Sequence, residues 1–382
     1  MTSLPAPSAA QQAASQALLQ LIQHELNQAG GWLPFADYMR LALYAPGLGY
    51  YSGGSRKFGA AGDFVTAPEL SPLFAQCLAR PVAQVLQQCG GDVLEVGAGS
   101  GRLALDLLQA LAALGQLPAR YLILELSAEL AQRQRETLAA EPALLARVSW
   151  LTALPQAFVG AIVGNEVLDA MPCRLVCWQG GAWWERGVCW REGLAWEDKP
   201  LADATVVAHI ATDGLPDGYV TEIQPEACGF VASLAEATSQ GVLILPDYGF
   251  VASEYYHPQR HRGTLMCHYR HHSHDDPFHL PGLEDITTHV DFSAIWRAGE
   301  VAGWQLEGYT AQGAFLLDAG LLECMAGMDS QSQDYFRAAA AAQKLVGPAE
   351  MGELFKVIAF SRNLALPGLL AGFGRDDRSG GL

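Results

Sequence analysis

The sequence predicts an α/β fold built on an open, doubly wound parallel sheet, with an N-terminal helical cap and an inserted β-rich lobe. The chain has 382 residues, of which 50% are hydrophobic, so it can bury one large core beside a smaller lobe. Short apolar runs typical of buried strands, such as DVLEV at 92–96, alternate with helical patterns, such as RLALDLLQALAAL from Arg102. A Trp-rich stretch with glycine turns interrupts this alternation and predicts the β-rich lobe.

These patterns divide the chain into a core and several additions. We expect an N-terminal helical cap with a substrate loop at 1–80, a core at 81–172 and 220–365, a β-rich insertion at 173–219, a His-rich insertion within the core at 253–295, and a flexible tail at 366–382. Further core strands are expected in RYLILEL from Arg120, RVSWL from Arg147, GAIVG from Gly160, GVLILPDYG from Gly241 and the late segments GWQLEGYTAQ and LFKVIAFSRN.

The N-terminal cap contains a helical pattern at 17–27 and a second one, PFADYMRLALY, from Pro34. A loop rich in glycine and tyrosine follows, and it is long for a segment without a function. Its acidic residues Asp63 and Glu69 are candidates for contact with a substrate. The alternative for Glu69 is that it only closes a turn.

The strand at 92–96 ends in a glycine turn that predicts a cofactor site. Glu95 precedes Gly97, Gly99 and Gly101, whose bare backbone lets a ligand lie at the N-terminus of the next helix. A dinucleotide site needs a small residue at the position that Arg102 occupies. The G-x-G-x-G form with a preceding acid is instead common in enzymes that bind S-adenosylmethionine.

The next strand strengthens this prediction because it ends in Glu125, where an acidic residue would accept hydrogen bonds from both ribose hydroxyls. The alternative is a solvated carboxylate that precedes the helix beginning near Ser127. With both signals in register, we expect Glu95, Gly97, Gly99, Gly101 and Glu125 to bind S-adenosylmethionine.

The fourth expected strand, from Gly160, ends in polar residues. In an open parallel sheet ligands bind outside the carboxyl ends of the strands, so Asn165, Glu166 and Asp169 should face the cofactor. We expect Asn165 to contact the cofactor and the two acids to act in catalysis. The alternative for Asp169 is that it caps a helix.

The segment from His257 to His289 contains eight of the ten histidines. The histidines do not form an i, i+4 pair with a Glu between them, and the sequence pattern does not supply the usual cysteine partners, so we expect no metal there. A loop that covers the substrate and orders with it is the preferred interpretation.

The composition excludes some function classes. A formal net charge of −17 argues against a nucleic acid partner, because binding phosphates needs clustered Lys and Arg. The acidic surface would suit a basic protein substrate or simply keep the protein soluble. No apolar run reaches the ~18 residues that span a bilayer, and the N-terminal 16 residues contain no Lys or Arg, so we expect a cytoplasmic protein without membrane insertion.

Several motifs together resemble the family of MidA-like methyltransferases, which includes the mitochondrial complex I assembly factor that symmetrically dimethylates an arginine. They are YAPGLGYY from Tyr44, GAAGDFVTAPELSPLF from Gly59, LEVGAGSG from Leu94, NEVLDAMP from Asn165, DYGF from Asp247 and DDPFHLPGLEDITTHVDF from Asp275. The resemblance covers roughly 22–362 and implies a Rossmann-like class I methyltransferase fold with an added lobe. It also implies S-adenosyl-L-methionine as donor and a protein arginine, in a complex I core subunit, as a candidate acceptor.

A guanidinium is a weak nucleophile because it stays protonated, and a carboxylate that aligns it or accepts its proton would help. The candidate catalytic acids are Glu166, Asp169, Asp63 and Glu69. Two alternatives stay open: a methyltransferase for a small molecule, and a non-catalytic assembly factor that binds the cofactor. The sequence does not reveal the oligomeric state.

Overall fold

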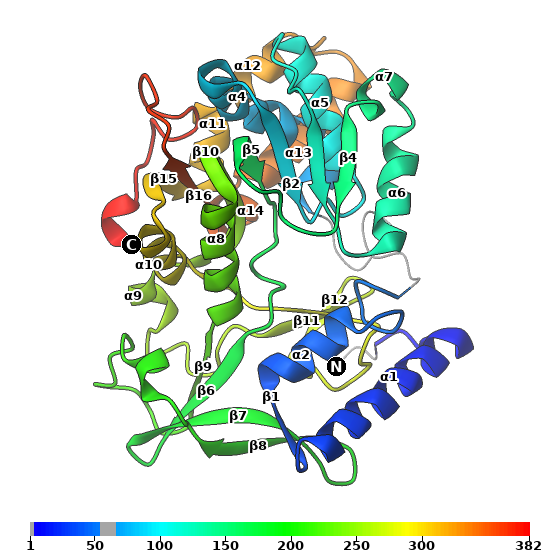
Figure 1. Ribbon diagram of the computed structural model, residues 1–382, viewed down its shortest axis with the longest axis vertical. Helices are drawn as coiled ribbons and strands as arrows, with labels where there is room; N and C mark the ends of the chain where they lie inside the picture. Colours follow the sequence, from blue (N-terminus) through cyan, green and yellow to red (C-terminus); the bar gives the residue numbers. More distant parts are fainter. Residues whose placement is uncertain (1–3, 54–65) are drawn as a thin grey trace. The chain divides into compact units, whose positions relative to one another are not determined.

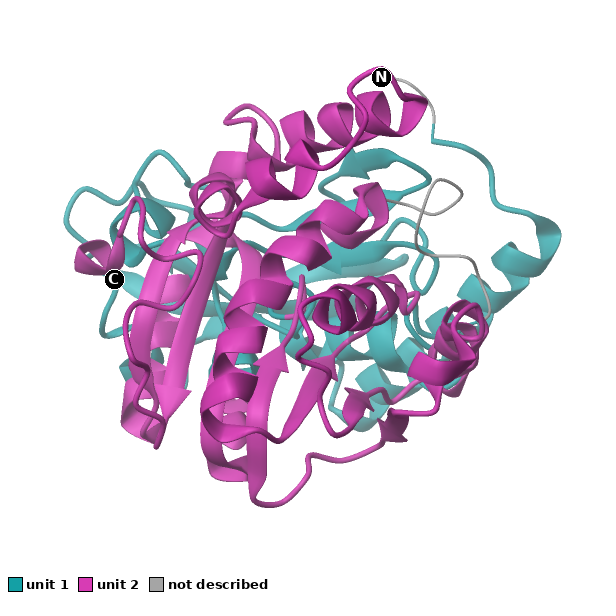
Figure 2. Cartoon of the chain, turned by 90° about the horizontal axis from the view of Figure 1, so that it is seen from above, with its two compact units in different colours: residues 1–64, 168–228, 251–291 teal, residues 65–167, 229–250, 292–382 magenta. Residues whose placement is uncertain are grey.

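The computed structural model describes residues 4–53 and 66–382, and these residues form two compact units. Unit 1 contains Met1–Phe64, Leu168–Cys228 and Val251–Asp291, and unit 2 contains Val65–Val167, Gly229–Phe250 and Phe292–Leu382 (Figure 2). The chain therefore passes between the units five times.

Unit 2 contains the expected open sheet, whose strands follow the order β15-β16-β10-β5-β2-β3-β4 (Figure 1). The strands are β2 (Asp92–Val96), β3 (Tyr121–Leu124), β4 (Val148–Leu151), β5 (Phe158–Val163), β10 (Thr238–Phe250), β15 (Gln305–Ala311) and β16 (Phe355–Arg362). The five strands from β10 to β4 pair in parallel, whereas β16 is antiparallel to both β10 and β15. The predicted α/β sheet is confirmed.

The helices of unit 2 begin and end at signals that the sequence supplies. They are α3 (Ala67–Leu70), α4 (Pro72–Cys89), α5 (Arg102–Ala113), α6 (Ala128–Leu138), α7 (Pro142–Leu145), α10 (Phe292–Ala302), α11 (Gln312–Asp318), α12 (Leu321–Ala326), α13 (Gln333–Val346) and α14 (Met351–Leu354). Ser71 caps α4 by accepting a hydrogen bond from the backbone N–H of Leu73, and Pro72 occupies the first position. Leu78 of α4 and Leu107 of α5 pack in one core with Val93 of β2.

Unit 1 combines three segments that are far apart in the sequence. Its elements are α1 (Ala9–Gln28), β1 (Trp32–Pro34), α2 (Phe35–Tyr44), β6 (Arg174–Gln179), β7 (Ala182–Trp190), β8 (Leu194–Pro200), β9 (Tyr219–Ile223), α9 (Ala252–Tyr255), β11 (Met266–Tyr269), β12 (His272–His274), β13 (Asp285–Thr287) and β14 (Val290–Asp291). Helix α8 (Pro225–Ala237) begins in unit 1 and ends in unit 2. The antiparallel strands β6, β7 and β8 confirm the Trp-rich meander.

The division into units differs from the expected domains. The N-terminal cap, the Trp-rich strands and the His-rich segment share one unit, because β1 pairs with β7 and because Leu18, Val188 and Cys267 lie in one apolar core. The His-rich segment was expected to be a loop that orders with the substrate. In the structure, three of its strands, β11, β12 and β13, form a three-stranded sheet. These contacts are long-range, so periodicity along the chain does not reveal them.

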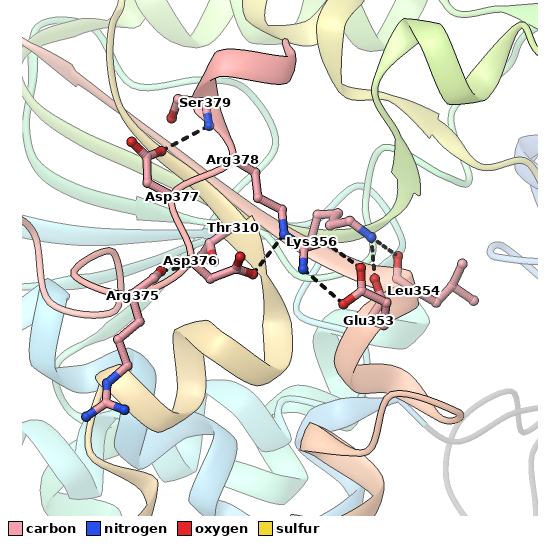
Figure 3. Close-up of polar contacts among 9 residues, drawn as sticks. All are labelled: Thr310, Glu353, Leu354, Lys356, Arg375, Asp376, Asp377, Arg378 and Ser379. Atoms are coloured by element: carbon pink, nitrogen blue, oxygen red, sulfur yellow. Dashed lines mark hydrogen bonds and ion pairs between the residues drawn. The ribbon is translucent and has the colours of Figure 1, made fainter.

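The end of the chain is packed within unit 2, in contrast to the flexible tail expected at 366–382. Leu370 and Phe373 are buried, and the Phe373 ring lies 5.4 Å from that of Phe315. Arg378 forms ion pairs with Glu353 and with Asp376 (Figure 3). Apolar residues and one bridging guanidinium therefore fix a segment that has little regular structure of its own.

Among the described residues, none of the helices combines the length and the apolar character that crossing a membrane requires.

Candidate functional site

The glycine turn after β2 adopts a backbone conformation that glycine tolerates best. Gly97, Gly99 and Gly101 have φ values of 66°, 52° and 81°. A Cβ atom on Gly101 would lie 3.0 Å from the Cα atom of Gln134, so the missing side chain lets α6 approach the turn. The turn therefore presents bare backbone at the N-terminus of α5, as the sequence predicts.

Glu95 precedes this turn and is 1% exposed. The Tyr121 hydroxyl donates a hydrogen bond to Glu95 Oε2 at 2.6 Å, which joins β2 to β3. Burial raises the pKa of Glu95 to about 7, although the hydrogen bond from Tyr121 opposes this shift. The structure thus holds Glu95 inside the sheet, immediately before the turn.

This raised pKa predicts a pH dependence of stability in the absence of donor. The unfolded chain loses the Glu95 proton near pH 4.5, whereas the folded protein keeps it up to about pH 7. Stability therefore falls as pH rises through this interval. Between pH 5 and 8, we expect the unfolding free energy of the wild type to decline by about 2 kcal/mol more than that of Glu95→Gln, which has no carboxyl group to titrate at this position. Urea denaturation at both pH values measures it, and equal declines in the two proteins would contradict the assignment.

Glu125 follows β3 and is oriented by two hydrogen bonds. The backbone N–H of Ser127 donates to Glu125 Oε1 at 2.8 Å, and the Gln134 side-chain amide donates to Oε2 at 2.9 Å. The same amide donates to the carbonyl oxygen of Gly99 at 3.2 Å, so Gln134 joins the acid to the glycine turn. Gln134 is fully buried on α6. Sequence reasoning missed it, because a Gln on an amphipathic helix gives no signal of burial.

We expect Glu125→Ala to weaken binding of S-adenosylmethionine by about 10- to 150-fold, because the ribose hydroxyls would lose a charged acceptor. Isothermal titration calorimetry measures this loss. Glu129→Ala is the matched control, since Glu129 is an exposed acid in the first turn of α6. Affinity within about threefold of wild type in Glu125→Ala would remove Glu125 from the donor site.

The chain after β5 brings a second polar group beside the glycine turn. A Cβ atom on Gly97 would lie 3.2 Å from Cγ2 of Val167, so the segment from Asn165 to Val167 lies against the turn. Asp247 in β10 is 1% exposed and accepts a hydrogen bond from the backbone N–H of Val167 at 3.1 Å. Asp247 thus fixes this segment.

Glu166 has a φ of 52°, which is unusual for a residue with a side chain and is often found at functional sites. Its backbone N–H donates to the carbonyl oxygen of Pro246 at 3.0 Å. The Asn165 amide donates to Glu166 Oε1 at 2.9 Å. The buried Oδ1 atom of Asn165 has no hydrogen-bond partner among the described residues.

The other candidate acids have different surroundings. Glu69, in α3, accepts a hydrogen bond from the hydroxyl of Ser100, so it lies at the glycine turn. Asp169 is buried in unit 1, where its carbonyl oxygen accepts from the backbone N–H of Thr288 at 3.0 Å. Asp63 lies outside the described residues. Within unit 2, the structure therefore brings Glu69, the glycine turn, Glu125 and the Asn165–Glu166 pair to the carboxyl ends of neighbouring strands.

This edge of the sheet is the topological switch point, because the chain leaves β2 toward β3 on one side and returns to β5 on the other. Open α/β sheets bind ligands in the crevice at that point. The three glycines of the turn and the buried Oδ1 atom of Asn165, which has no hydrogen-bond partner among the described residues, fit a cofactor that carries hydrogen-bond donors. Gly97, Gly99 and Gly101 would contact it through their backbone.

Several known proteins are similar to this chain along most of its length. A family model described as an S-adenosyl-L-methionine-dependent methyltransferase matches residues 77–310. The mouse protein named protein arginine methyltransferase NDUFAF7, mitochondrial, is 27% identical over 390 residues, covering 92% of this chain and 86% of the mouse protein. Its Caenorhabditis elegans homologue is 27% identical over 304 residues, covering 70% of this chain and 68% of the homologue.

A solved structure is similar along the whole chain. A Burkholderia thailandensis protein, crystallised with S-adenosyl-homocysteine, is 54% identical, has a TM-score of 0.96 and covers 100% of both chains. A native crystal structure from the same organism gives a TM-score of 0.93. The fold is therefore that of a class I methyltransferase, as the resemblance implies.

The expected cytoplasmic location is wrong by the same comparison, because the curated relatives are mitochondrial proteins. That expectation used the absence of a long apolar run and the absence of Lys and Arg among the N-terminal 16 residues. A feature of one short segment is weaker evidence than similarity along most of the chain.

The fold, the glycine turn at the switch point and the match over 77–310 lead to one conclusion. The chain belongs to a family of S-adenosyl-L-methionine-dependent methyltransferases and uses S-adenosyl-L-methionine as its methyl donor.

Proposed function

We propose that this methyltransferase transfers the methyl group to the ω-nitrogen of an arginine in a protein substrate. The observation that carries the proposal is the Asn165–Glu166 pair beside the glycine turn, where Glu166 is held at a φ of 52°. A carboxylate at this position can accept two parallel hydrogen bonds from a guanidinium, which orients the planar group. The Asn165 amide would orient this carboxylate and leave its own Oδ1 atom for the donor.

The chemistry needs this kind of positioning. The attacking nitrogen must lie about 3 Å from the methyl carbon and in line with the breaking S–C bond. The N–C bond forms as the S–C bond breaks, the sulfur keeps the electron pair, and the nitrogen releases one proton. Glu166 would align the guanidinium, hold its positive charge away from the reacting nitrogen and accept this proton.

The remaining acids would have supporting roles in this proposal. Glu69 would fix the glycine turn through its hydrogen bond with Ser100, and would so position the donor. Asp169 and Asp63 are assigned to the acceptor side by the sequence argument alone. Binding of the donor is assigned to Glu95, Glu125, Asn165 and the turn.

The names of the relatives support arginine as the acceptor, since the mouse and nematode proteins are called protein arginine methyltransferases. The net charge of −17 is compatible with a basic substrate segment. By resemblance, a core subunit of respiratory complex I is the candidate substrate.

Mass spectrometry of arginine methylation in cells lacking this gene tests the proposal. We expect at least one dimethylated arginine to disappear and to return with the wild-type gene, but not with Gly99→Val. If Gly99→Val restores the cellular function lost with the gene but not the methylation, the protein acts as a non-catalytic assembly factor. If a small metabolite loses its methyl group instead, the acceptor is a small molecule.

A further inference from the structure

The His-rich segment of unit 1 folds into a sheet that places a cysteine opposite a histidine. Strands β11 and β12 pair antiparallel, with Cys267 in register with His274. Arg270 and His271 form the tight turn between them, with φ values of 48° and 64°. Positive φ at both positions is the mark of the two-residue hairpin turn that matches strand twist. Directly opposed residues project from the same face of a sheet, so the thiol and the imidazole are neighbours.

A buried carboxylate joins this pair. Glu284 immediately precedes β13, which pairs with the other edge of β11. Its side chain is 0% exposed, and Oε2 lies 3.0 Å from Nε2 of His274. Neither carboxylate oxygen forms a hydrogen bond of good geometry with a described residue, and the His274 ring and the backbone at Leu280 stabilise its negative charge from nearby. The nearby hydroxyl of Tyr38 donates its hydrogen bond to the carbonyl oxygen of Pro277 and not to the Glu284 carboxylate.

A metal ion would compensate this buried charge more fully than an imidazole and one backbone group do, because burying a charge without strong compensating contacts costs several kcal/mol. Sγ of Cys267, a ring nitrogen of His274 and a carboxylate oxygen of Glu284 lie within 4.8 Å of one another. Ligands of tetrahedral zinc are about 3.3–3.8 Å apart, given bonds of about 2.0–2.3 Å. Small side-chain rotations would bring the three atoms to that spacing.

We propose that Cys267, His274 and Glu284 bind a zinc ion. Thiolate, imidazole and carboxylate together are donors that zinc accepts in proteins, whereas magnesium and calcium prefer oxygen alone. The His274 side chain is 15% exposed, so an ion can enter at that edge and a water molecule can take the fourth position. The site does not depend on the proposed arginine chemistry.

The ion would tie three parts of the chain together. Cys267 lies in β11, His274 in β12, and Glu284 in the segment that enters β13. Cys267 and Ile286 also belong to the apolar core formed with α1 and α2, so a bond at Cys267 would fix this sheet to that core. The sequence does not indicate this cluster, because Cys267 and Glu284 do not have a spacing typical of zinc ligands and are brought together only by the sheet.

Metal analysis of the full-length protein, purified without chelator, tests the proposal. We expect about one zinc per chain in the wild type, and less than about a tenth of that in Cys267→Ser and in His274→Gln. Cys177→Ser and His272→Gln are the matched controls, since Cys177 is another buried thiol and His272 lies in the same strand as His274. Both controls should keep the metal.

Two measurements on the wild type keep the test decisive if a variant does not fold. Cobalt added to protein stripped of metal should produce a near-ultraviolet thiolate charge-transfer band. Added zinc should protect Cys267 from alkylation, as mapped by mass spectrometry. Protein that binds neither ion would overturn the proposal, as would zinc retained undiminished in Cys267→Ser. Because no donor or substrate is present, failure here leaves the arginine proposal unaffected.

Discussion

Glu166→Gln is expected to bind S-adenosylmethionine as the wild type does and to transfer methyl groups about 10²–10⁴-fold more slowly. The substitution keeps the shape of the side chain and its hydrogen bond with Asn165, but it removes the negative charge. An amide cannot hold the charge of a guanidinium or accept its proton. The loss should therefore fall on turnover and leave the donor in place.

Calorimetry and a transfer assay with the same protein separate the two effects. Glu236→Gln is the control, because Glu236 is an exposed acid on α8, and it should behave as the wild type. If donor affinity falls in step with turnover, Glu166 belongs to the donor site and the acceptor group must be sought at Glu69 or Asp63. If neither changes, the carboxylate has no part in the reaction.

Gly99→Val is expected to weaken donor binding by more than about 100-fold. Two causes act together. A branched side chain is strongly disfavoured at the φ of 52° that Gly99 adopts, and it would occupy the space where the cofactor contacts the backbone. The carbonyl oxygen of Gly99 also accepts a hydrogen bond from Gln134, so a shift of this residue would disturb Glu125 through the shared amide.

Gly115→Val separates these causes. Gly115 has a φ of 69° at the end of α5, and a Cβ atom there would meet no other atom within 4 Å. This control carries similar backbone strain away from the turn, so it should lower the melting temperature without changing donor affinity. Calorimetry on both folded variants measures the difference. If Gly99→Val binds the donor as tightly as Gly115→Val does, the donor binds elsewhere in the protein.

The sequence predicted the elements of unit 2 because their signals are local. A fully buried run such as DVLEV is a strand in almost any context, and Ser71 with Pro72 begins a helix through contacts within one turn. The glycine turn was predicted for the same reason, since its three positive φ values belong to alternate residues of one short stretch.

What the sequence could not reveal depends on contacts between distant segments. Gln134 reaches the glycine turn and Glu125 only because α6 packs there. The pairing of β1 with β7 makes one unit from segments that were expected to be separate domains. The end of the chain is fixed by Phe373 against Phe315 and by Arg378 against Glu353, which composition does not disclose.

Incubation of the purified protein with S-adenosylmethionine carrying a labelled methyl group, in an extract of cells that lack the gene, tests the central claim most directly. After acid hydrolysis of the protein fraction, we predict that the label is recovered as ω-methylated arginine, and that Glu166→Gln abolishes this signal although it still binds the donor. Label recovered in another amino acid, or only in small molecules, would contradict the account.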